Sequence, residues 1–345
     1  EGSAYIDMTF ADTAVASIGN GAATANGYFQ YIAASGTNTI TVGSDFSYGG
    51  QANFSMLNGA TNSLTAQDNA AQSGSLFYYG GNGTDTLSFA DSLANGSGVA
   101  NFDMQAGGNN SIAALEGAGR NGTLNYTGGP QADTLSFGSD VAYSGAVHID
   151  NSAGGSNTFT GLGFSAIAGT ITYLGGTGSD SLTLGGEAAG YNGKIEVDVT
   201  AGGYNTFTFG EAAAIQGGMI IYEGGVGVDE VEFGTEAGRS GTISIDLGAD
   251  SAADKVHFLG TIGGQDEYAS IGEQQGHVTI QNYNLSDDTI ELPIGITATA
   301  AEIADSDGNL TWSDSNGNHI MTFLGIGTGG SGITASPSQL VDSMI

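Results

Sequence analysis

The chain contains no cysteine, only 3 prolines and only 4 lysines and arginines among its 345 residues. Without cysteine there is no disulfide framework and no thiolate site for a metal or for covalent catalysis. The low proline content excludes a collagen-like or proline-rich chain. No run approaches the 18 consecutive apolar residues of a membrane-spanning helix, so we expect no membrane insertion.

The few basic residues also restrict the partners of the chain. They are Arg120, Lys194, Arg239 and Lys255, and they stand against 36 acidic residues, which gives a formal charge of −32. These four side chains cannot build a basic face, so we expect neither nucleic acid nor an anionic membrane as a partner. A chain of this charge repels itself, and salt or divalent cations are the agents expected to screen the repulsion.

Glycine and the aromatic residues are abundant. The chain has 61 glycines, 15 phenylalanines, 14 tyrosines and 1 tryptophan. The apolar residues supply a core, which argues against disorder. Glycine at this density is typical of tight turns, so the composition predicts many short strands joined by turns.

A repeat dominates the chain. Segments such as Gly80-Gly-Asn-Gly-Thr-Asp-Thr-Leu-Ser-Phe and Gly128-Gly-Pro-Gln-Ala-Asp-Thr-Leu-Ser-Phe return at intervals of 23 to 25 residues. Such a constant period is the signature of a repeat architecture. One Asp or Asn marks each unit, and these marker positions are Asn38, Asn62, Asp85, Asn110, Asp133, Asn157, Asp180, Asn205, Asp229 and Asp254.

Each repeat contains two stretches in which apolar residues alternate with polar ones. The stretch after the marker includes Leu87 and Phe89, and a second stretch about ten residues before a marker includes Leu124 and Tyr126. Alternation with a period of two predicts half-buried strands. The fold class predicted is therefore all-β, a parallel β-solenoid of about ten coils of near 24 residues, with two sheets that share one core. An antiparallel sandwich is the alternative, but a sandwich has no reason to keep one step length.

The pattern changes near residue 262. We expect residues 1–262 to be the solenoid and residues 263–345 to be a C-terminal β cap with hairpins at Asp307-Gly308 and Asn316-Gly317. A cap is expected on physical grounds, because an uncovered solenoid end is an unpaired sheet edge. The chain starts at Glu1 without Met and without a signal-peptide pattern, so we expect a processed protein or a part of a longer one.

Three turns match the glycine-rich nonapeptide G-G-x-G-x-D-x-apolar-x at every fixed position, namely residues 80–88, 175–183 and 224–232. The chain thus resembles the haemolysin-type RTX proteins, a type I-secreted bacterial family that includes surface-layer proteins and adhesins. The resemblance implies an extracellular location, calcium in the Gly-Asp turns and an uncleaved C-terminal secretion region. The chain departs from that family in its 24-residue coil and in the alternation of Asp with Asn.

Two explanations of the marker positions remain open. Stacked Asp and Asn side chains form a ladder by bonding to their own turn and to the neighbouring coil, and alternation with Asn doubles the distance between carboxylates. Alternatively, the carboxylates and backbone carbonyls of the turns bind Ca²⁺, which prefers oxygen ligands. The candidate calcium ligands are Asp85, Asp133, Asp180, Asp229, Asp250, Asp254, Asp266, Asp287, Asp288, Asp305 and Asp307.

The outward positions of the second strand carry mostly Thr and Ser, for example Thr39 and Thr41. A flat Thr-x-Thr array is typical of ice-binding solenoids, although Thr is also an ordinary strand residue. Glu230, Glu232 and His257 interrupt the array further along the chain.

The sequence offers little for catalysis. The four histidines lie in different coils, and no motif for a metal or for nucleophilic catalysis is present. We therefore expect a non-enzymatic, secreted structural protein that associates with itself, head-to-tail or laterally, in a bacterial surface layer or matrix filament stabilised by calcium. The alternatives are a calcium-dependent adhesin or module that binds cell-surface glycan, and a carbohydrate-active β-helix enzyme.

Overall fold

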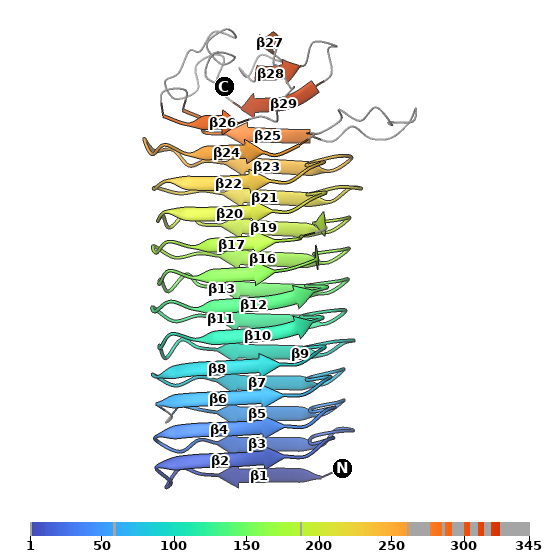
Figure 1. Cartoon of the computed structure of the whole chain (residues 1–345), viewed down its shortest axis with the longest axis vertical. Coiled ribbons are helices and arrows are strands. Elements are labelled where there is room, and N and C mark those ends of the chain that lie inside the picture. The colour runs from blue at the N-terminus through green and yellow to red at the C-terminus, as the bar shows by residue number, and fades with distance from the viewer. Residues whose placement is uncertain are drawn as a thin grey trace. The chain divides into compact units, whose positions relative to one another are not determined.

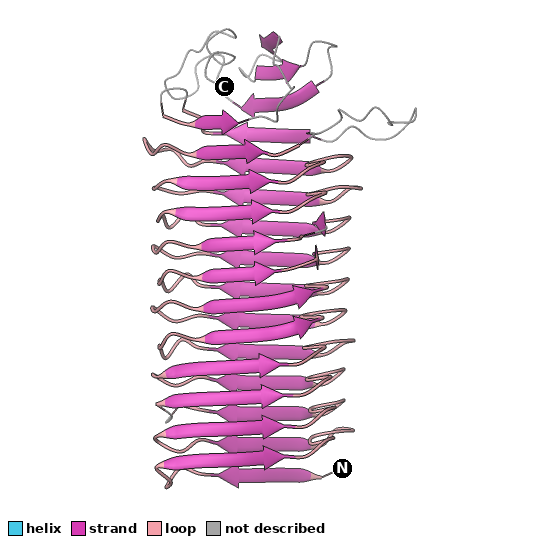
Figure 2. Ribbon diagram, in the orientation of Figure 1, coloured by secondary structure: helices cyan, strands magenta, loops and turns pink. Residues whose placement is uncertain are grey.

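The computed structural model describes residues 2–57, 60–186, 188–260, 262, 277–284, 287–291, 300–303, 310–313 and 319–324. It confirms an all-β parallel β-solenoid with two main sheets, coils of about 24 residues and about 11 turns (Figure 1). The described residues contain no helix, and thus none that could span a membrane (Figure 2). The turn count exceeds the ten predicted because the first coil holds Ala14 where later coils hold Asp or Asn.

The chain forms two compact units, Glu1–Gly178 and Ser179–Ile345. In the first unit one sheet has the order β1-β3-β5-β7-β9-β11-β13-β16, and the other has the order β2-β4-β6-β8-β10-β12-β14. Its strands are β1 Ser3–Asp7, β2 Thr13–Ile18, β3 Tyr28–Ile32, β4 Thr37–Val42, β5 Gln51–Ser55, β6 Thr61–Ala66, β7 Ser75–Tyr79, β8 Thr84–Phe89, β9 Val99–Asp103, β10 Ser111–Glu116, β11 Thr123–Thr127, β12 Thr134–Ser139, β13 Ala146–Asp150, β14 Thr158–Gly161, β15 Phe164–Ser165 and β16 Thr170–Leu174.

The second unit is built from coils of the same kind. One of its sheets has the order β19-β21-β23-β25-β29-β28-β27, and the other has the order β17-β20-β22-β24-β26. Strands β27 to β29 pair antiparallel, in agreement with the hairpins predicted for the cap. The strands are β17 Ser181–Leu184, β18 Ala188–Ala189, β19 Lys194–Asp198, β20 Asn205–Phe209, β21 Met219–Glu223, β22 Asp229–Phe233, β23 Thr242–Asp246, β24 Lys255–Phe258, β25 His277–Gln281, β26 Thr289–Glu291, β27 Ala300–Ile303, β28 Leu310–Ser313 and β29 His319–Leu324.

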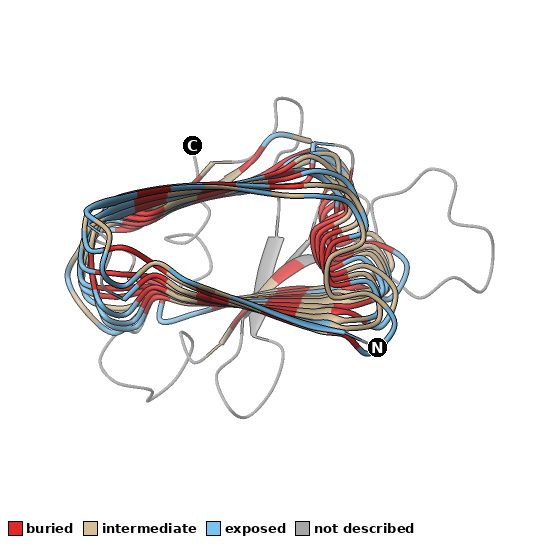
Figure 3. Cartoon of the chain, turned by 90° about the horizontal axis from the view of Figure 1, so that it is seen from below, coloured by how far each residue is buried: buried red, intermediate tan, exposed pale blue. Residues whose placement is uncertain are grey.

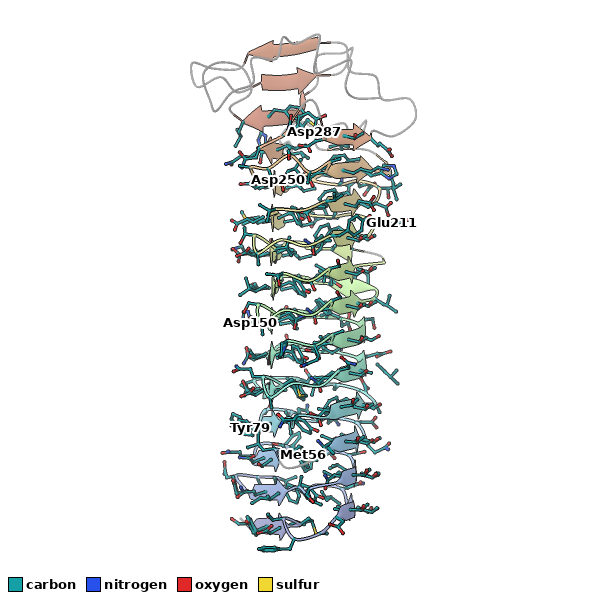
Figure 4. All side chains as sticks on the ribbon, turned by 90° about the vertical axis from the view of Figure 1, so that its left-hand side faces the viewer. Met56, Tyr79, Asp150, Glu211, Asp250 and Asp287 are labelled. Carbon is teal, nitrogen blue, oxygen red and sulfur yellow. The ribbon has the colours of Figure 1, made fainter. Side chains whose placement is uncertain are left out.

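The core lies between the two sheets and consists of stacked apolar columns. Within the first unit Tyr31, Phe54 and Tyr78 occupy matching positions on successive strands, with ring centroids 6.2 and 6.3 Å apart. Every second residue of a strand points inward and is buried, as the alternation in the sequence predicts. Figure 3 colours the buried residues red. The other side chains project outward in rows (Figure 4).

The turn that follows most strands of the second sheet, such as the turn between β6 and β7, repeats an unusual backbone conformation. In one coil Asn69, Ala71 and Ser73 all have positive φ, at 60°, 58° and 53°. A left-handed residue other than glycine costs roughly 1–2 kcal/mol. The cost is offset because these N–H groups bond to carbonyls of adjacent coils, as Ala71 does to Phe46 over 2.9 Å.

The glycine that follows this turn is required by the close approach of neighbouring coils. A Cβ added to Gly74 would lie 1.9 Å from the backbone oxygen of Ser47, and one added to Gly145 would lie 2.0 Å from that of Gly119. No side chain fits at such a distance. These positions explain the glycine that precedes the strand in most repeats.

Candidate functional site

The marker residues of the first unit form one buried column. They sit at inward positions at the start of the strands of the second sheet, and each is at most 3 % exposed. The Asn38 side-chain amide donates to Asn62 Oδ1 over 2.8 Å, and Asn110 Nδ2 donates to Asp133 Oδ1 over 3.0 Å. The predicted column is therefore confirmed within this unit, and its side chains point into the interior of the solenoid and away from solvent.

Backbone groups bind the column as well. The Asp85 N–H donates to Asn110 Oδ1 over 3.2 Å, and the Asp133 N–H donates to Asn157 Oδ1 over 3.0 Å. In these two pairs a side-chain oxygen accepts a hydrogen bond from the backbone of the preceding coil. A hydrogen bond to a charged group contributes about 1.5–3 kcal/mol, and one between neutral groups about 1 kcal/mol.

The column of the second unit ends differently. Asn205 Nδ2 donates to Asp229 Oδ1 over 2.9 Å, but Asp254 and Asp288 follow without an intervening Asn. The Asp229 N–H donates to Asp254 Oδ1 over 2.8 Å, and the Asp254 N–H donates to Asp288 Oδ1 over 3.1 Å. Three successive buried carboxyl groups result.

Burial raises the pKa of every column carboxyl for which a shift is resolved. Burial raises the pKa of Asp85 and Asp133 above the ordinary value, while hydrogen bonds from Asn62 and Tyr78 to Asp85 and from Asn110 to Asp133 oppose the rise. Burial raises the pKa of Asp229 to about 6. The pKa of Asp254 rises to about 7, because of burial and because Asp288 and Asp229 are both carboxylates.

Tyrosine hydroxyls lie beside the carboxyl groups. Tyr78 OH donates to Asp85 Oδ1 over 3.2 Å. Tyr126 approaches Asp133 closely enough to influence its pKa, yet neither the Tyr126 hydroxyl nor Asp133 Oδ2 makes a hydrogen bond of normal geometry. A Cβ added to Gly128 would lie 2.8 Å from Asp133 Oδ2, so the glycine backbone fills the space beside that oxygen.

The hydrogen bonds around the column carboxylates favour the ladder over calcium. Ca²⁺ takes 6–8 oxygen ligands. The groups around Asp85 and Asp133 are mainly N–H donors, which a carboxylate accepts and a cation does not. Asp180 lies in the same kind of buried position, 2 % exposed. The ladder explanation therefore accounts for the column residues by their geometry.

The remaining predicted ligands lie outside the column. Both Asp250 oxygens accept backbone N–H groups, from Gly227 and from Ala252, each over 2.8 Å. Asp287 is exposed and accepts a hydrogen bond from the Asn284 side-chain amide over 2.8 Å. In Figure 4, Asp250 and Asp287 mark these positions in the second unit. Asp266, Asp305 and Asp307 lie outside the described residues.

An accessible acidic row was not singled out in the sequence. Asp198, Glu223 and Asp246 occupy matching positions on the adjacent strands β19, β21 and β23, so their carboxylates are neighbours. Strand spacing of about 4.8 Å separates them. Aligning the acid that ends each of these strands would have revealed the row. We call these three residues the acidic row.

A charged cluster surrounds a hollow of about 100 Å³ on strands β20, β22 and β24. Lys255 Nζ lies 2.9 Å from Glu291 Oε1. His257 lies between two glutamates, with Nδ1 3.5 Å from Glu232 Oε2 and Nε2 3.7 Å from Glu291 Oε2. Of the four Lys and Arg residues only Lys255 lies here, and its contact with Glu291 is a cross-strand ion pair.

All four basic side chains of the chain take part in ion pairs. Besides Lys255, Arg120 pairs with Asp140, Lys194 with Glu196 and Arg239 with Glu236, at 2.9–3.5 Å. These partners account for only a few of the 36 acidic residues, so the remaining accessible carboxylates have no basic side chain to neutralise them.

Outward side chains of the second sheet form two regular columns in the first unit. From β2 to β14 the two central outward positions of each strand stay in register, and twelve of the fourteen hold Ser or Thr, with Val15 and Ala113 as the exceptions. We call these twelve residues the Thr/Ser face: Ser17, Thr39, Thr41, Ser63, Thr65, Thr86, Ser88, Ser111, Thr134, Ser136, Thr158 and Thr160.

The described residues contain no group of three or more His, Asp or Glu side chains arranged to hold a metal ion. Comparisons of the chain with protein-family models, with curated proteins and with solved structures each found no match.

Proposed function

We propose that this chain is a structural element of an extracellular bacterial surface layer or matrix, and that it associates with further copies of itself. The observation that carries the proposal is the coil-to-coil ladder, in which Asn110 and its counterparts join each coil to the next by side chain and backbone. Each coil contacts its neighbours in the stack, so the stack as a whole is the stable unit.

The resemblance to RTX proteins supports the extracellular location. The three nonapeptide matches and the absence of cysteine are both typical of that type I-secreted family. A type I-secreted surface protein would meet calcium outside the cell, where it folds and assembles.

In this proposal calcium screens the negative charge of the chain. The acidic row of Asp198, Glu223 and Asp246 concentrates negative charge on three adjacent strands, where divalent cations screen it, although one oxygen each of Asp198 and Asp246 accepts a backbone N–H. Because all four basic side chains are engaged in ion pairs, cations from the medium are left to screen the charge of −32. Calcium bound at accessible carboxylates therefore lowers the repulsion between copies.

Electron microscopy of the purified chain with and without millimolar calcium tests the proposal. We expect ordered layers or filaments with calcium and dispersed particles after chelation. Dispersed particles under both conditions would contradict the structural role. Among the described residues the exposed aromatic side chains are Tyr5, Phe10, Tyr48, Phe164 and Tyr204; Tyr5 and Phe10 share the first coil and the others belong to separate coils, which gives the glycan-binding alternative little support.

A further inference from the structure

The Thr/Ser face carries no charge, and it differs from the outer face of the other sheet in its uniform Ser and Thr side chains, because matching positions there hold Gln30, Asn53 and Phe77. Its two columns, which run from β2 to β14, include no Asp, Glu, Lys, Arg or His, although the chain has a formal charge of −32. In the second unit the corresponding columns carry Glu230, Glu232, Lys255, His257 and Glu291. Within the second unit Ser181, Thr183, Thr206 and Thr208 on β17 and β20 are also uncharged, so the charges of these columns lie on β22, β24 and β26.

The hydroxyl groups of this face are free to bond outside the protein. None of the twelve side chains makes a hydrogen bond within the part of the chain that the structure describes, and most are exposed, as Thr39, Thr41 and Thr86 are. Thr is branched at Cβ, which restricts its χ1 torsion. Strand neighbours at about 4.8 Å restrict it further. The hydroxyls and methyls are therefore held in place before any ligand arrives.

The face has the dimensions of a crystal lattice. Neighbouring columns of one strand are two residues apart, about 6.6 Å, and neighbouring strands are about 4.8 Å apart. A tetrahedral water network with O–H···O distances of about 2.75 Å places second-neighbour oxygens about 4.5 Å apart, and its stacking repeat is 8/3 of that bond, about 7.3 Å. The cross-strand spacings differ by about 0.3 Å per step, and the spacings along the strand differ by about 0.7 Å over the single step taken.

We propose that the Thr/Ser face binds ice. A periodic, flat array selects a periodic ligand, because its many weak contacts form together only when the ligand repeats with the same spacing. The absence of charge fits ice, which excludes ions, while the Thr methyls order water and the hydroxyls anchor it. Crystalline polysaccharide is the other periodic, uncharged solid, but its recognition relies on flat aromatic side chains, and neither column contains one.

The test is uptake into slowly growing ice, with the full chain kept in chelator so that the result does not depend on calcium-driven assembly. We expect the chain to be enriched in the ice over an inert acidic globular protein. We expect Thr86→Tyr and Thr39→Tyr each to lower uptake to the level of that inert protein, because a bulky ring lifts the lattice off the face. Tyr is a good strand residue, and circular dichroism confirms that each variant folds.

A matched control is Thr172→Tyr, which adds the same ring at an outward position of β16 on the other sheet. It is expected to keep wild-type uptake. The proposal is overturned if the wild type is not enriched in ice, or if Thr172→Tyr loses as much uptake as Thr86→Tyr. It is also overturned if the chain binds crystalline cellulose or chitin but not ice, or if Thr86→Tyr alters only self-association.

Discussion

Asn110 donates its side-chain amide to the carboxylate of Asp133 in the next coil, with 3.0 Å between Nδ2 and Oδ1, and both side chains are buried. The same Asn accepts the Asp85 backbone N–H through its Oδ1. An amide supplies both a donor and an acceptor, whereas a carboxylate only accepts. Where Asn alternates with Asp, a buried carboxylate therefore accepts a hydrogen bond from an amide and does not face a second carboxylate.

The first prediction follows from this pair. Asn110→Asp is isosteric, but it places a third buried carboxyl between Asp85 and Asp133 and removes the amide donor. We expect a loss of about 3 kcal/mol in the free energy of unfolding at pH 7 and a smaller loss at pH 4, where the carboxyl groups are neutral. Chemical denaturation at both pH values measures the difference.

Asn125→Asp is the control for that prediction. Asn125 also donates its amide to a neighbouring Asn, Asn101, over 2.8 Å, but from an outward position on β11. We expect a loss below about 1 kcal/mol there. Equal losses at the two sites would contradict the role given to the buried column.

The second prediction concerns pH. The folded-state pKa of Asp229 is about 6 and that of Asp254 about 7, both above the ordinary value of 3.8. The folded state thus binds protons more tightly than the unfolded state. The resulting stabilisation is complete below about pH 4 and is lost as the pH rises through 6 and 7. We expect Tm to fall between pH 4 and pH 8.

Asp254→Asn separates this effect from the general charge of the chain. The substitution restores the alternation of carboxyl and amide between Asp229 and Asp288. We expect Tm to rise by a few degrees at pH 8, which corresponds to roughly 1 kcal/mol, and to change little at pH 4. A variant that lowers Tm at pH 8 would show that the carboxyl group is needed there.

The third prediction concerns glycine. Gly74→Ala brings a Cβ to 1.9 Å from the Ser47 backbone oxygen, whereas Gly19→Ala meets nothing within 4 Å. We expect the first substitution to cost more than about 2 kcal/mol, because backbone of two coils must separate, and the second to be nearly neutral. Thermal unfolding of both variants checks the contrast, and a tolerated Gly74→Ala would argue against the close stacking of coils.

Much of this fold could be predicted from the sequence, because its physical causes are local and periodic. The 23 to 25-residue step and the alternation in segments such as Leu87-Ser-Phe89 define coil length, strands and inward faces. The antiparallel pairing of β28 with β29 agrees with the Asn316-Gly317 dipeptide between them. The first coil lies within the predicted solenoid, residues 1–262, but it carries Ala14 at the marker position, so counting markers gives one coil fewer.

The turns and the charged positions could not be predicted in the same way. Ala71 and Ala142 have φ of 58° and 53°, which local propensity disfavours and only hydrogen bonds to adjacent coils stabilise. The burial of Asp85 and Asp133 could not be predicted either, because the resemblance to the nonapeptide family implies calcium-binding loops at Gly-Asp turns. The acidic row and the charged cluster depend on register between strands, which a single repeat does not reveal.

The fourth prediction concerns calcium and stability. Asp198→Asn combined with Glu223→Gln removes two carboxylates of the acidic row. We expect calcium to raise the Tm of the wild type by linkage and to raise that of the double variant less. Asp133→Asn, a change in the buried column, is expected to keep the full calcium-induced shift. A shift that disappears with Asp133→Asn and survives the double variant would place the calcium in the column.

Sedimentation velocity of the purified chain, with calcium titrated at constant ionic strength, tests the proposed assembly most directly. The account predicts that the monomer boundary gives way to faster-sedimenting species at millimolar calcium, that chelator reverses the change, and that the same ionic strength of sodium does not reproduce it. A single monomer boundary at every calcium concentration would contradict the assembly and leave only the solenoid.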